Sequence, residues 1–276
     1  MKKGMATNLI LILAFLLGLS LLLYPTFSDY WNSLHQSRAV SSYVAEAEKL
    51  DSGRYDEILA AAHEYNAYAA EKPNQWAMSE EDLAWYESLL SIGGSNIMAQ
   101  IEIPSIGVNL PVYHGTSDGV LQIAAGHLST TSLPVGGLGT HAVLSGHRGL
   151  PSAKLFTDLD DLREGDLFSI RVLNEILTYE VDQILIVEPT DIASLEIDPM
   201  QDYVTLVTCT PYGINTHRLL VRGHRVENFE QEKAVRVTAD AVQVEPIIVA
   251  PFVAVPMLLV LLLILLFGSK KKKQKK

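Results

Sequence analysis

The stretch DYVTLVTCTPYGINTHRLLVRGHRV, residues 202–226, has the pattern of two β-strands joined by a short loop. Apolar runs lie on both sides of this loop, and Pro211 and Gly213 within it interrupt strand geometry. Cys209 ends the first predicted strand, where the sheet fixes the backbone while the side chain can face a cleft. It is the only cysteine of the 276-residue chain, so it has no disulfide partner within the chain. The count alone leaves two interpretations, a buried structural residue or a reactive thiol.

Similar short runs fill the sequence from residue 97 onward, and Gly, Pro, Asn and Asp separate them. Further strands are predicted at residues 97–104, 108–113, 141–146, 166–173 and 176–187. The one clear helical insert is SAKLFTDLDDL, residues 152–162. About seven strands with tight connections favour a mainly β fold, a closed or nearly closed barrel.

The region before the barrel has helical spacing instead. Ile58, Ala61, Ala62 and Tyr65 recur at the period of an amphipathic helix. Asp51, Ser52 and Ser79 are candidate N-caps, and Lys72-Pro73-Asn74 breaks the pattern. We therefore expect two or three helices, followed by a turn at Gly93-Gly94.

Two apolar runs flank these regions, residues 8–24 and residues 246–268. Each is long enough to cross about 30 Å of hydrocarbon as a helix. The first could be a cleaved signal peptide, but it has no A-x-A-like cleavage site, which favours a retained anchor. Pro251 and Pro256 weaken the second run as a straight helix, although lipid-embedded helices tolerate prolines near an end.

Lysines mark the cytoplasmic side of both predicted spans. Lys2 and Lys3 precede the first span, and six lysines follow the second. The positive-inside rule therefore places both termini in the cytoplasm and residues 28–245 outside. The predicted order is a cytoplasmic tip and anchor (1–27), a helical region (28–96), the barrel (97–227), a polar linker (228–245), the second span (246–268) and a Lys-rich tail (269–276).

The predicted external part is acidic. It holds 13 Lys and Arg against 32 Asp and Glu, once the eight lysines of the cytoplasmic flanks are set aside. A nucleic-acid-binding protein needs a basic face, so this balance argues against one. An acidic surface that aids solubility is the simpler interpretation.

Three residues could form a catalytic site around the thiol. A thiol reacts well only as the thiolate, so a catalytic cysteine needs a base or a cation nearby. His147 lies just past a predicted strand end, between Gly146 and Gly149, and Arg218 opens the strand after Cys209. His141, at the start of the same strand as His147, is too far away to share its site.

Each candidate also has a structural alternative. Taken singly, His147 is more often a hydrogen-bonded turn residue, and Arg218 a surface or ion-pair residue. Thr208, before the cysteine, could bind substrate but is more often structural, and the same holds for Ser145 and Thr210. Metal binding fits poorly, because the sequence has one cysteine, no HExxH and no close histidine pair.

Three longer segments resemble the sortases, the cell-surface transpeptidases of Gram-positive bacteria, and within them class C, the pilus-assembling subgroup. They are IEIPSIGVNLPVYHGTSDGVLQIAAGHLSTTSLPVGG, GTHAVLSGHRGLPSAKLFTDLDDL and TLVTCTPYGINTHRLLVRGHR, within residues 97–226. The resemblance implies an eight-stranded sortase β-barrel between two transmembrane helices. It also implies that Cys209 is the nucleophile, His147 the acid/base and Arg218 the group that stabilises the oxyanion or positions the substrate.

The resemblance further implies a reaction and its partners. An LPxTG-like sorting signal would be cut between Thr and Gly, and a lysine amine of a pilin subunit would resolve the thioacyl enzyme. No metal or organic cofactor is implied, and we expect a monomer at the cell membrane. Two alternatives stay open: a housekeeping-type sortase that attaches proteins to peptidoglycan, and a membrane-held binding module without turnover.

One feature of class C is missing from the helical region. These enzymes usually carry a lid with an Asp-Pro-aromatic motif over the cysteine, and residues 28–97 contain no such tripeptide. The nearest substitute is Trp76, in the sequence KPNQW. A lid role for Trp76 is one interpretation, and packing between the helices and the barrel is the more usual one.

Overall fold

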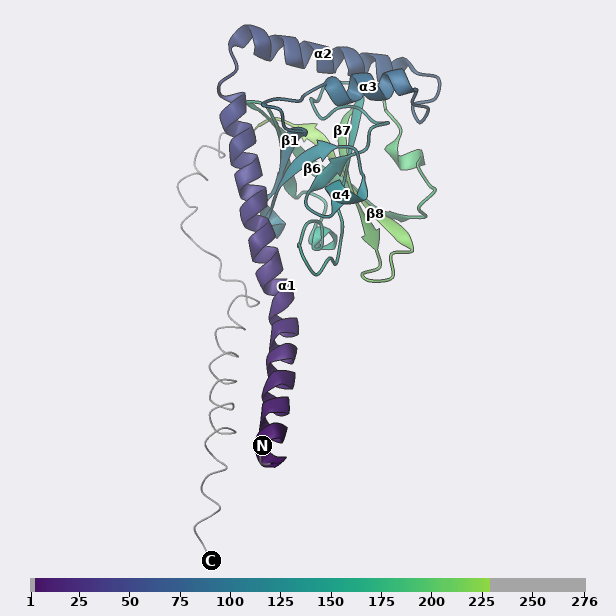
Figure 1. Cartoon of the computed structure of the whole chain (residues 1–276). Coiled ribbons are helices and arrows are strands. Elements are labelled where there is room, and N and C mark those ends of the chain that lie inside the picture. The colour runs from purple at the N-terminus through teal and green to yellow at the C-terminus, as the bar shows by residue number, and fades with distance from the viewer. Residues whose placement is uncertain (1–2, 229–276) are drawn as a thin grey trace, which may run out of the picture. The chain divides into compact units, whose positions relative to one another are not determined.

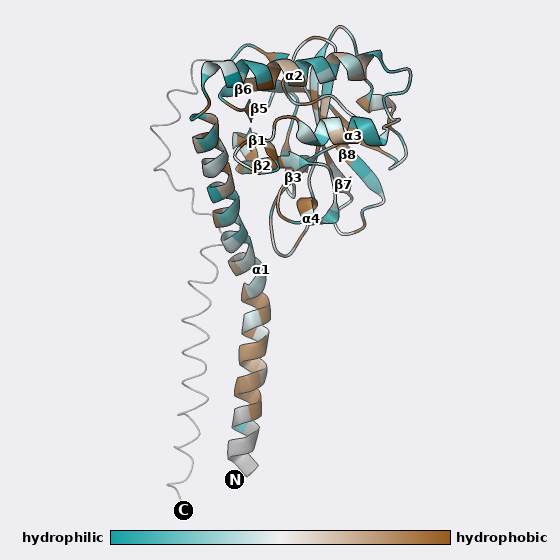
Figure 2. Ribbon diagram, turned by 45° about the horizontal axis from the view of Figure 1, so that its top comes forward, coloured by the Kyte–Doolittle hydropathy of each residue, from teal (hydrophilic) through white to brown (hydrophobic). Residues whose placement is uncertain are grey.

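The computed structural model describes residues 3–228, in which residues 3–30 and 31–228 belong to two separate compact units (Figure 1). The predicted second span at 246–268, the Lys-rich tail and almost all of the linker lie outside the described residues. Helix α1 (Lys3–Ala47) begins in the first unit and continues into the second. Its N-terminal half is apolar, as the brown ribbon in Figure 2 shows, and is long enough to cross a membrane.

Two further helices precede the barrel, as the helical spacing predicts. Helix α2 (Ser52–Glu71) begins after Asp51, whose carboxylate accepts a hydrogen bond from the Arg54 amide at 3.0 Å. Helix α3 (Glu80–Ser88) begins with a capping box formed by Ser79 and Asp82. Both caps satisfy amides that have no partner within the helix. The third cap candidate, Ser52, is instead the first residue of its helix.

Eight strands close into a barrel in the order β1-β2-β3-β4-β7-β8-β6-β5, which confirms the predicted fold class. The strands are β1 (Ile97–Ile103), β2 (Val108–His114), β3 (Ala125–His127), β4 (Thr140–Ser145), β5 (Leu167–Val172), β6 (Glu175–Val187), β7 (Asp202–Thr210) and β8 (His217–Val226). Two pairs, β2 with β3 and β4 with β7, are parallel, and the other pairs are antiparallel.

Two details differ from the prediction. The sequence pattern does not predict strand β3, because three residues are too few to show a period-2 alternation. The predicted helical insert at 152–162 is wrong, since the structure has turns there and a single 3-10 turn at Leu159–Asp161. Its apolar residues Leu155, Phe156 and Leu159 are instead buried in the main core by an irregular segment.

Alternation along the strands separates two apolar regions. Leu206 of β7 and Val221 of β8 point into the main core. Val143 of β4 and Leu220 of β8 have the opposite parity and form a second, smaller cluster with Leu195. That cluster therefore lies on the outer face of the barrel wall, and we call it the outer cluster.

Candidate active site

The predicted nucleophile and the predicted arginine lie directly opposite each other. Strands β7 and β8 are antiparallel, without a bulge, and their register pairs Cys209 with Arg218. Opposite residues in an antiparallel pair project from the same face, with Cβ atoms about 5 Å apart. Cys209 shares its parity with Val207, so both side chains leave the barrel wall on the outer face.

The predicted acid/base lies on the other side of the cysteine. Strands β4 and β7 are parallel, and their last paired residues are Ser145 and Val207. The ladder continues past the end of β4, because the Gly146 amide donates to the Val207 carbonyl at 3.0 Å. His147, two residues beyond Ser145, therefore stands at the level of Cys209, two residues beyond Val207. Neighbouring strands lie about 4.8 Å apart, so the backbones of all three candidates lie within two strand spacings.

The Cys209 thiol and the Arg218 guanidinium are both partly exposed, so a substrate could reach them. Arg218 donates to the carbonyls of Asn215 at 3.4 Å and His217 at 3.1 Å. In the part of the chain that the structure describes, no carboxylate forms an ion pair with Arg218. Its charge is therefore not neutralised and can act on an anion that forms beside Cys209.

The loop of His147 is packed against the segment that follows it. The ring of Phe156 lies on Gly146, where an added Cβ would come within 2.6 Å of the ring. The Phe156 amide also donates to the His147 carbonyl at 3.1 Å. Because only glycine lets the ring approach this closely, Gly146 fixes the point where His147 leaves the strand.

Comparisons with known proteins agree with this arrangement. A sortase domain model matches residues 101–226. Sortase C1 from Streptococcus agalactiae is 50% identical, with a TM-score of 0.68, and the match covers 70% of this chain and 100% of that one. Sortase C from Streptococcus pneumoniae is 40% identical, with a TM-score of 0.63 and coverage of 69% and 97%. Sortase A from Bacillus anthracis is 26% identical over 226 residues, which are 82% of this chain and 97% of that protein.

This chain belongs to the sortase family. Its structural neighbours include the class C sortases of S. agalactiae and S. pneumoniae. Sortases are cysteine transpeptidases, and Cys209 is the only cysteine of this one. The interpretation of the chain as a binding module without turnover is therefore set aside.

Two other histidines of this sortase are structural. His141 is buried, and its ring lies 2.9 Å from the Glu196 carbonyl and 2.7 Å from the Thr205 hydroxyl. His127 is also buried, and its Nδ1 lies 3.0 Å from the Tyr86 hydroxyl. Burial lowers the pKa of both rings, that of His127 to about 4. Both rings are therefore neutral at pH 7.

Thr208 also has a structural role. It is buried, and its hydroxyl donates to the Gly146 carbonyl at 2.8 Å. This hydrogen bond joins β7 to the residue before His147, so it supports the register of the site rather than a substrate. Residues 3–228 contain no group of three His, Cys, Asp or Glu side chains that could hold a metal ion.

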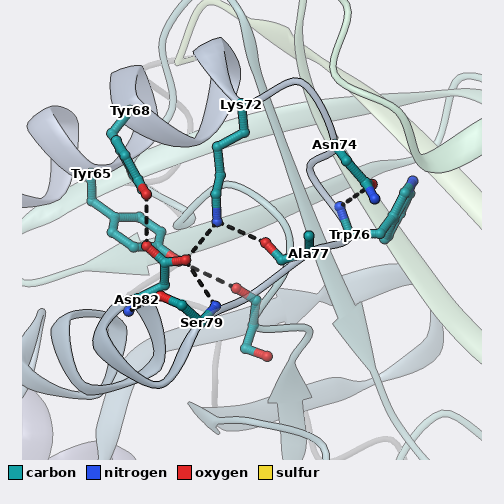
Figure 3. Close-up of polar contacts among 9 residues, drawn as sticks. Tyr65, Tyr68, Lys72, Asn74, Trp76, Ala77, Ser79 and Asp82 are labelled. Carbon is teal, nitrogen blue, oxygen red and sulfur yellow. Dashed lines mark hydrogen bonds and ion pairs between the residues drawn. The ribbon is translucent and has the colours of Figure 1, made fainter.

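The segment between α2 and α3 covers part of the outer face of the sortase. Trp76 packs on the outer cluster, and the Gln75 side chain bonds the backbone at Leu195 and Ile197. Figure 3 shows the Lys72 amine between the Asp82 carboxylate, at 2.8 Å, and the Ala77 carbonyl, at 2.8 Å, with Trp76 turned away from them. The hydrogen bond from Lys72 holds the pKa of Asp82 well below its usual range. These contacts hold the segment between α2 and α3 against both α3 and the barrel wall.

Proposed function

We propose that this sortase joins pilin subunits through isopeptide bonds. It would cleave an LPxTG-like sorting signal between Thr and Gly and transfer the threonine carbonyl to a lysine amine of another pilin. The observation that supports the proposal is the strand register, which pairs Cys209 with Arg218 and sets Ser145, two residues before His147, beside Val207. Support for pilin substrates comes from the relatives, since the S. pneumoniae sortase C structure is described in terms of pilin substrate specificity.

In the first half-reaction the Cys209 thiolate attacks the threonine carbonyl carbon and forms a C–S bond. The carbonyl oxygen becomes an oxyanion, and the guanidinium of Arg218 stabilises it. Protonated His147 donates its proton to the glycine nitrogen as the C–N bond breaks. The products are a thioacyl enzyme and a peptide with a free glycine amine.

The second half-reaction reverses these roles. The lysine amine attacks the thioester carbon, neutral His147 takes a proton from the amine, and the C–S bond breaks. The thiolate returns, His147 is protonated again, and an isopeptide bond joins the two subunits. Water in place of the amine would give hydrolysis as a side reaction.

The test of the first half-reaction is an LPxTG-containing peptide incubated with the full chain, followed by mass analysis. We expect a covalent acyl adduct on Cys209, and none in the Cys209→Ala or His147→Ala variant. An unmodified cysteine in the wild-type chain, with intact peptide, would overturn the proposal.

The acceptor is tested separately, with the same donor peptide and one of two amines. A peptide that carries a pilin lysine should yield a branched product. A glycine-type or diaminopimelate amine should yield little product. The opposite preference would favour the housekeeping-type alternative, which attaches proteins to peptidoglycan.

We also propose that the catalytic unit lies outside the cell, with both termini in the cytoplasm. The lysines at both ends of the sequence support this orientation, as does the apolar part of α1. A reporter that is active only in the cytoplasm, fused to the C-terminus of the full chain, should be active. An inactive reporter that external protease removes would exclude this topology.

A further inference from the structure

Arg148, the residue after His147, has an unusual environment for an arginine. Its side chain is only 9% exposed, and its Nε is buried without a hydrogen bond among the described residues. A buried guanidinium is costly unless it is paired, so this position must be compensated. One compensation is an ion pair from its Nη2 to the Asp160 carboxylate.

The second partner of Arg148 is Tyr212, which lies in the loop between β7 and β8, three residues after Cys209. The guanidinium carbon lies 5.7 Å from the centre of the Tyr212 ring, within the range of a cation–π interaction. The same ring lies against Gly149, where an added Cβ would come within 2.9 Å of it. Gly149 has a φ of +73°, so both its conformation and its contact with Tyr212 favour glycine.

These contacts hold the backbone of the His147 loop from two sides. Phe156 contacts Gly146 and His147, and the Thr157 hydroxyl accepts a hydrogen bond from the Gly149 amide at 3.2 Å. On the other side, Tyr212 contacts Gly149. Arg148 is the residue whose side chain reaches both sides, through Asp160 and through Tyr212, whereas Gly149 contacts both through its backbone.

The loop that carries Tyr212 is itself well ordered by short-range hydrogen bonds. The amides of Ile214 and Asn215 both donate to the Pro211 carbonyl, at 3.0 and 2.9 Å. Tyr212 is therefore held at a set position relative to Cys209. A link from Arg148 to this ring thus connects the loop of His147 to the loop that follows Cys209.

We infer that Arg148 is a positioning residue of the sortase reaction, which sets His147 at its working distance from Cys209. The inference rests on the proposed roles of these two residues. The His147 ring must both donate and accept a proton, so a small displacement of this ring lowers the chemical rate without weakening substrate binding. The effect of losing the link should therefore be found in kcat.

The experiment measures peptide cleavage and transfer by the full chain with Arg148→Gln and Arg148→Lys. We expect Arg148→Gln to lower kcat by about 10- to 100-fold and to change KM by less than about threefold. Arg148→Lys keeps the charge but not the planar fork, so it should recover part of kcat. If the measured rate falls only in proportion to the amount of folded protein, then kcat per folded molecule is normal. That result would overturn the inference.

The chain offers a matched control in Arg222. This arginine also pairs with a carboxylate, Asp182, at 3.0 Å through two nitrogens, and its guanidinium carbon lies 4.1 Å from the Tyr203 ring centre. It stands further along β8, away from the pair of Cys209 and Arg218. Arg222→Gln should leave kcat within about threefold of wild type. If Arg222→Gln lowers kcat as much as Arg148→Gln does, the loss of any arginine paired with a carboxylate and a ring would have the same effect through the fold. That result would overturn the inference.

Two partner variants keep the test decisive if Arg148→Gln fails to fold. Tyr212 is 59% exposed, so Tyr212→Leu should leave the thermal midpoint nearly unchanged. Asp160→Asn leaves the buried Arg148 guanidinium without its carboxylate and should lower the thermal midpoint, so kcat is taken per folded molecule. Each should lower kcat by about 3- to 30-fold, and the Arg148→Gln/Tyr212→Leu double variant should be little worse than Arg148→Gln alone. Normal kcat in both partner variants overturns the inference.

Acyl-adduct formation on Cys209 of the wild-type chain separates the two proposals. With an adduct on the wild type and normal kcat in the Arg148 and partner variants, the inference fails and the proposed function stands. Without any adduct on the wild type, the proposed function fails and the inference fails with it.

Discussion

At the scale of single residues, Arg218 is the group whose chemistry can be tested most directly. Its hydrogen bonds go to two backbone carbonyls and leave its charge without a carboxylate partner among the described residues. We predict that Arg218→Ala lowers kcat for peptide cleavage by about 10²–10³, the usual cost of losing one oxyanion donor. Arg218→Lys should recover part of that loss, because lysine keeps the charge without the fork.

The control for this prediction is Arg222→Ala, which removes the same charge four residues further along the same face of β8. Steady-state kinetics with the sorting peptide, together with the thermal midpoint of each variant, make the comparison. If Arg218→Ala retains wild-type kcat, the guanidinium has no part in the chemistry.

Tyr86 is a second residue whose role can be measured, because its hydroxyl contributes to the stability of the fold. It lies 3.0 Å from Nδ1 of buried His127 and accepts a hydrogen bond from the Gly115 amide at 3.0 Å. Tyr86→Phe would leave both nitrogens without this partner, so we predict a loss of about 1–3 kcal/mol in the free energy of unfolding. Tyr68→Phe is the matched control, since its hydroxyl is partly exposed and its loss should cost about 1 kcal/mol or less. Denaturant titrations measure both, and equal effects would contradict the prediction.

At the scale of elements, the sequence predicts helices and strands that have a regular pattern of apolar residues. It misses segments whose conformation depends on contacts with distant parts of the chain. Strand alternation and the caps at Asp51 and Ser79 are local signals, and the structure confirms them. Strand β3 and the irregular segment at 152–162 are fixed by tertiary contacts, such as those of Phe156 with the His147 loop, which have no local signature. For the same reason, the sequence gives no sign that Arg148 and Tyr212 are in contact.

The segment that carries Trp76 packs on the outer face of the barrel wall. Trp76 packs on the outer cluster, which borders Val207, two residues before Cys209 on the same face. A lid role for Trp76 predicts that Trp76→Ala raises the rate at which a thiol reagent labels Cys209 by about threefold or more. Trp85→Ala is the control, since that ring packs on Tyr65 and Tyr68 between the helices. A labelling rate that is unchanged by Trp76→Ala would assign Trp76 to packing alone.

At the scale of the whole catalytic unit, the helices and the barrel are joined by buried polar contacts. The Tyr43 hydroxyl of α1 donates to the Met98 carbonyl at 2.9 Å and accepts from the Leu173 amide at 2.7 Å. The Asn66 side chain of α2 exchanges two hydrogen bonds with the backbone of Leu133. The sequence distinguishes a helical region from a barrel, but it does not show that they share one core, because these contacts join residues 55 to 130 positions apart.

The stability of this unit should depend on pH through His127. Burial lowers the pKa of this ring to about 4, whereas an unfolded histidine titrates near 6.5. Between these values the unfolded chain binds more protons than the folded one, so the stability that the neutral ring gives is complete above about pH 6.5 and is lost as the pH falls towards about 4.

We predict a contribution of about 3 kcal/mol to this loss, measured as the free energy of unfolding between pH 7 and pH 4. His127→Gln should flatten the profile, because glutamine does not titrate. The control variant is His63→Gln, at an exposed position on α2. The same slope in all three proteins would exclude His127 as its source.

The parallel pairing of β4 with β7 has a consequence for the order in which the site forms. The hydrogen bond between Gly146 and Thr208 spans 62 positions, and pairings of such sequence separation form slowly, after local turns and helices. Before β4 pairs with β7, the local β7–β8 hairpin can already set Arg218 opposite Cys209, but His147, the proposed acid/base, is not yet beside the thiol. We therefore expect Cys209 to become reactive toward a sorting peptide only after β4 has paired with β7, so the last long-range pairing of the barrel would also complete the site.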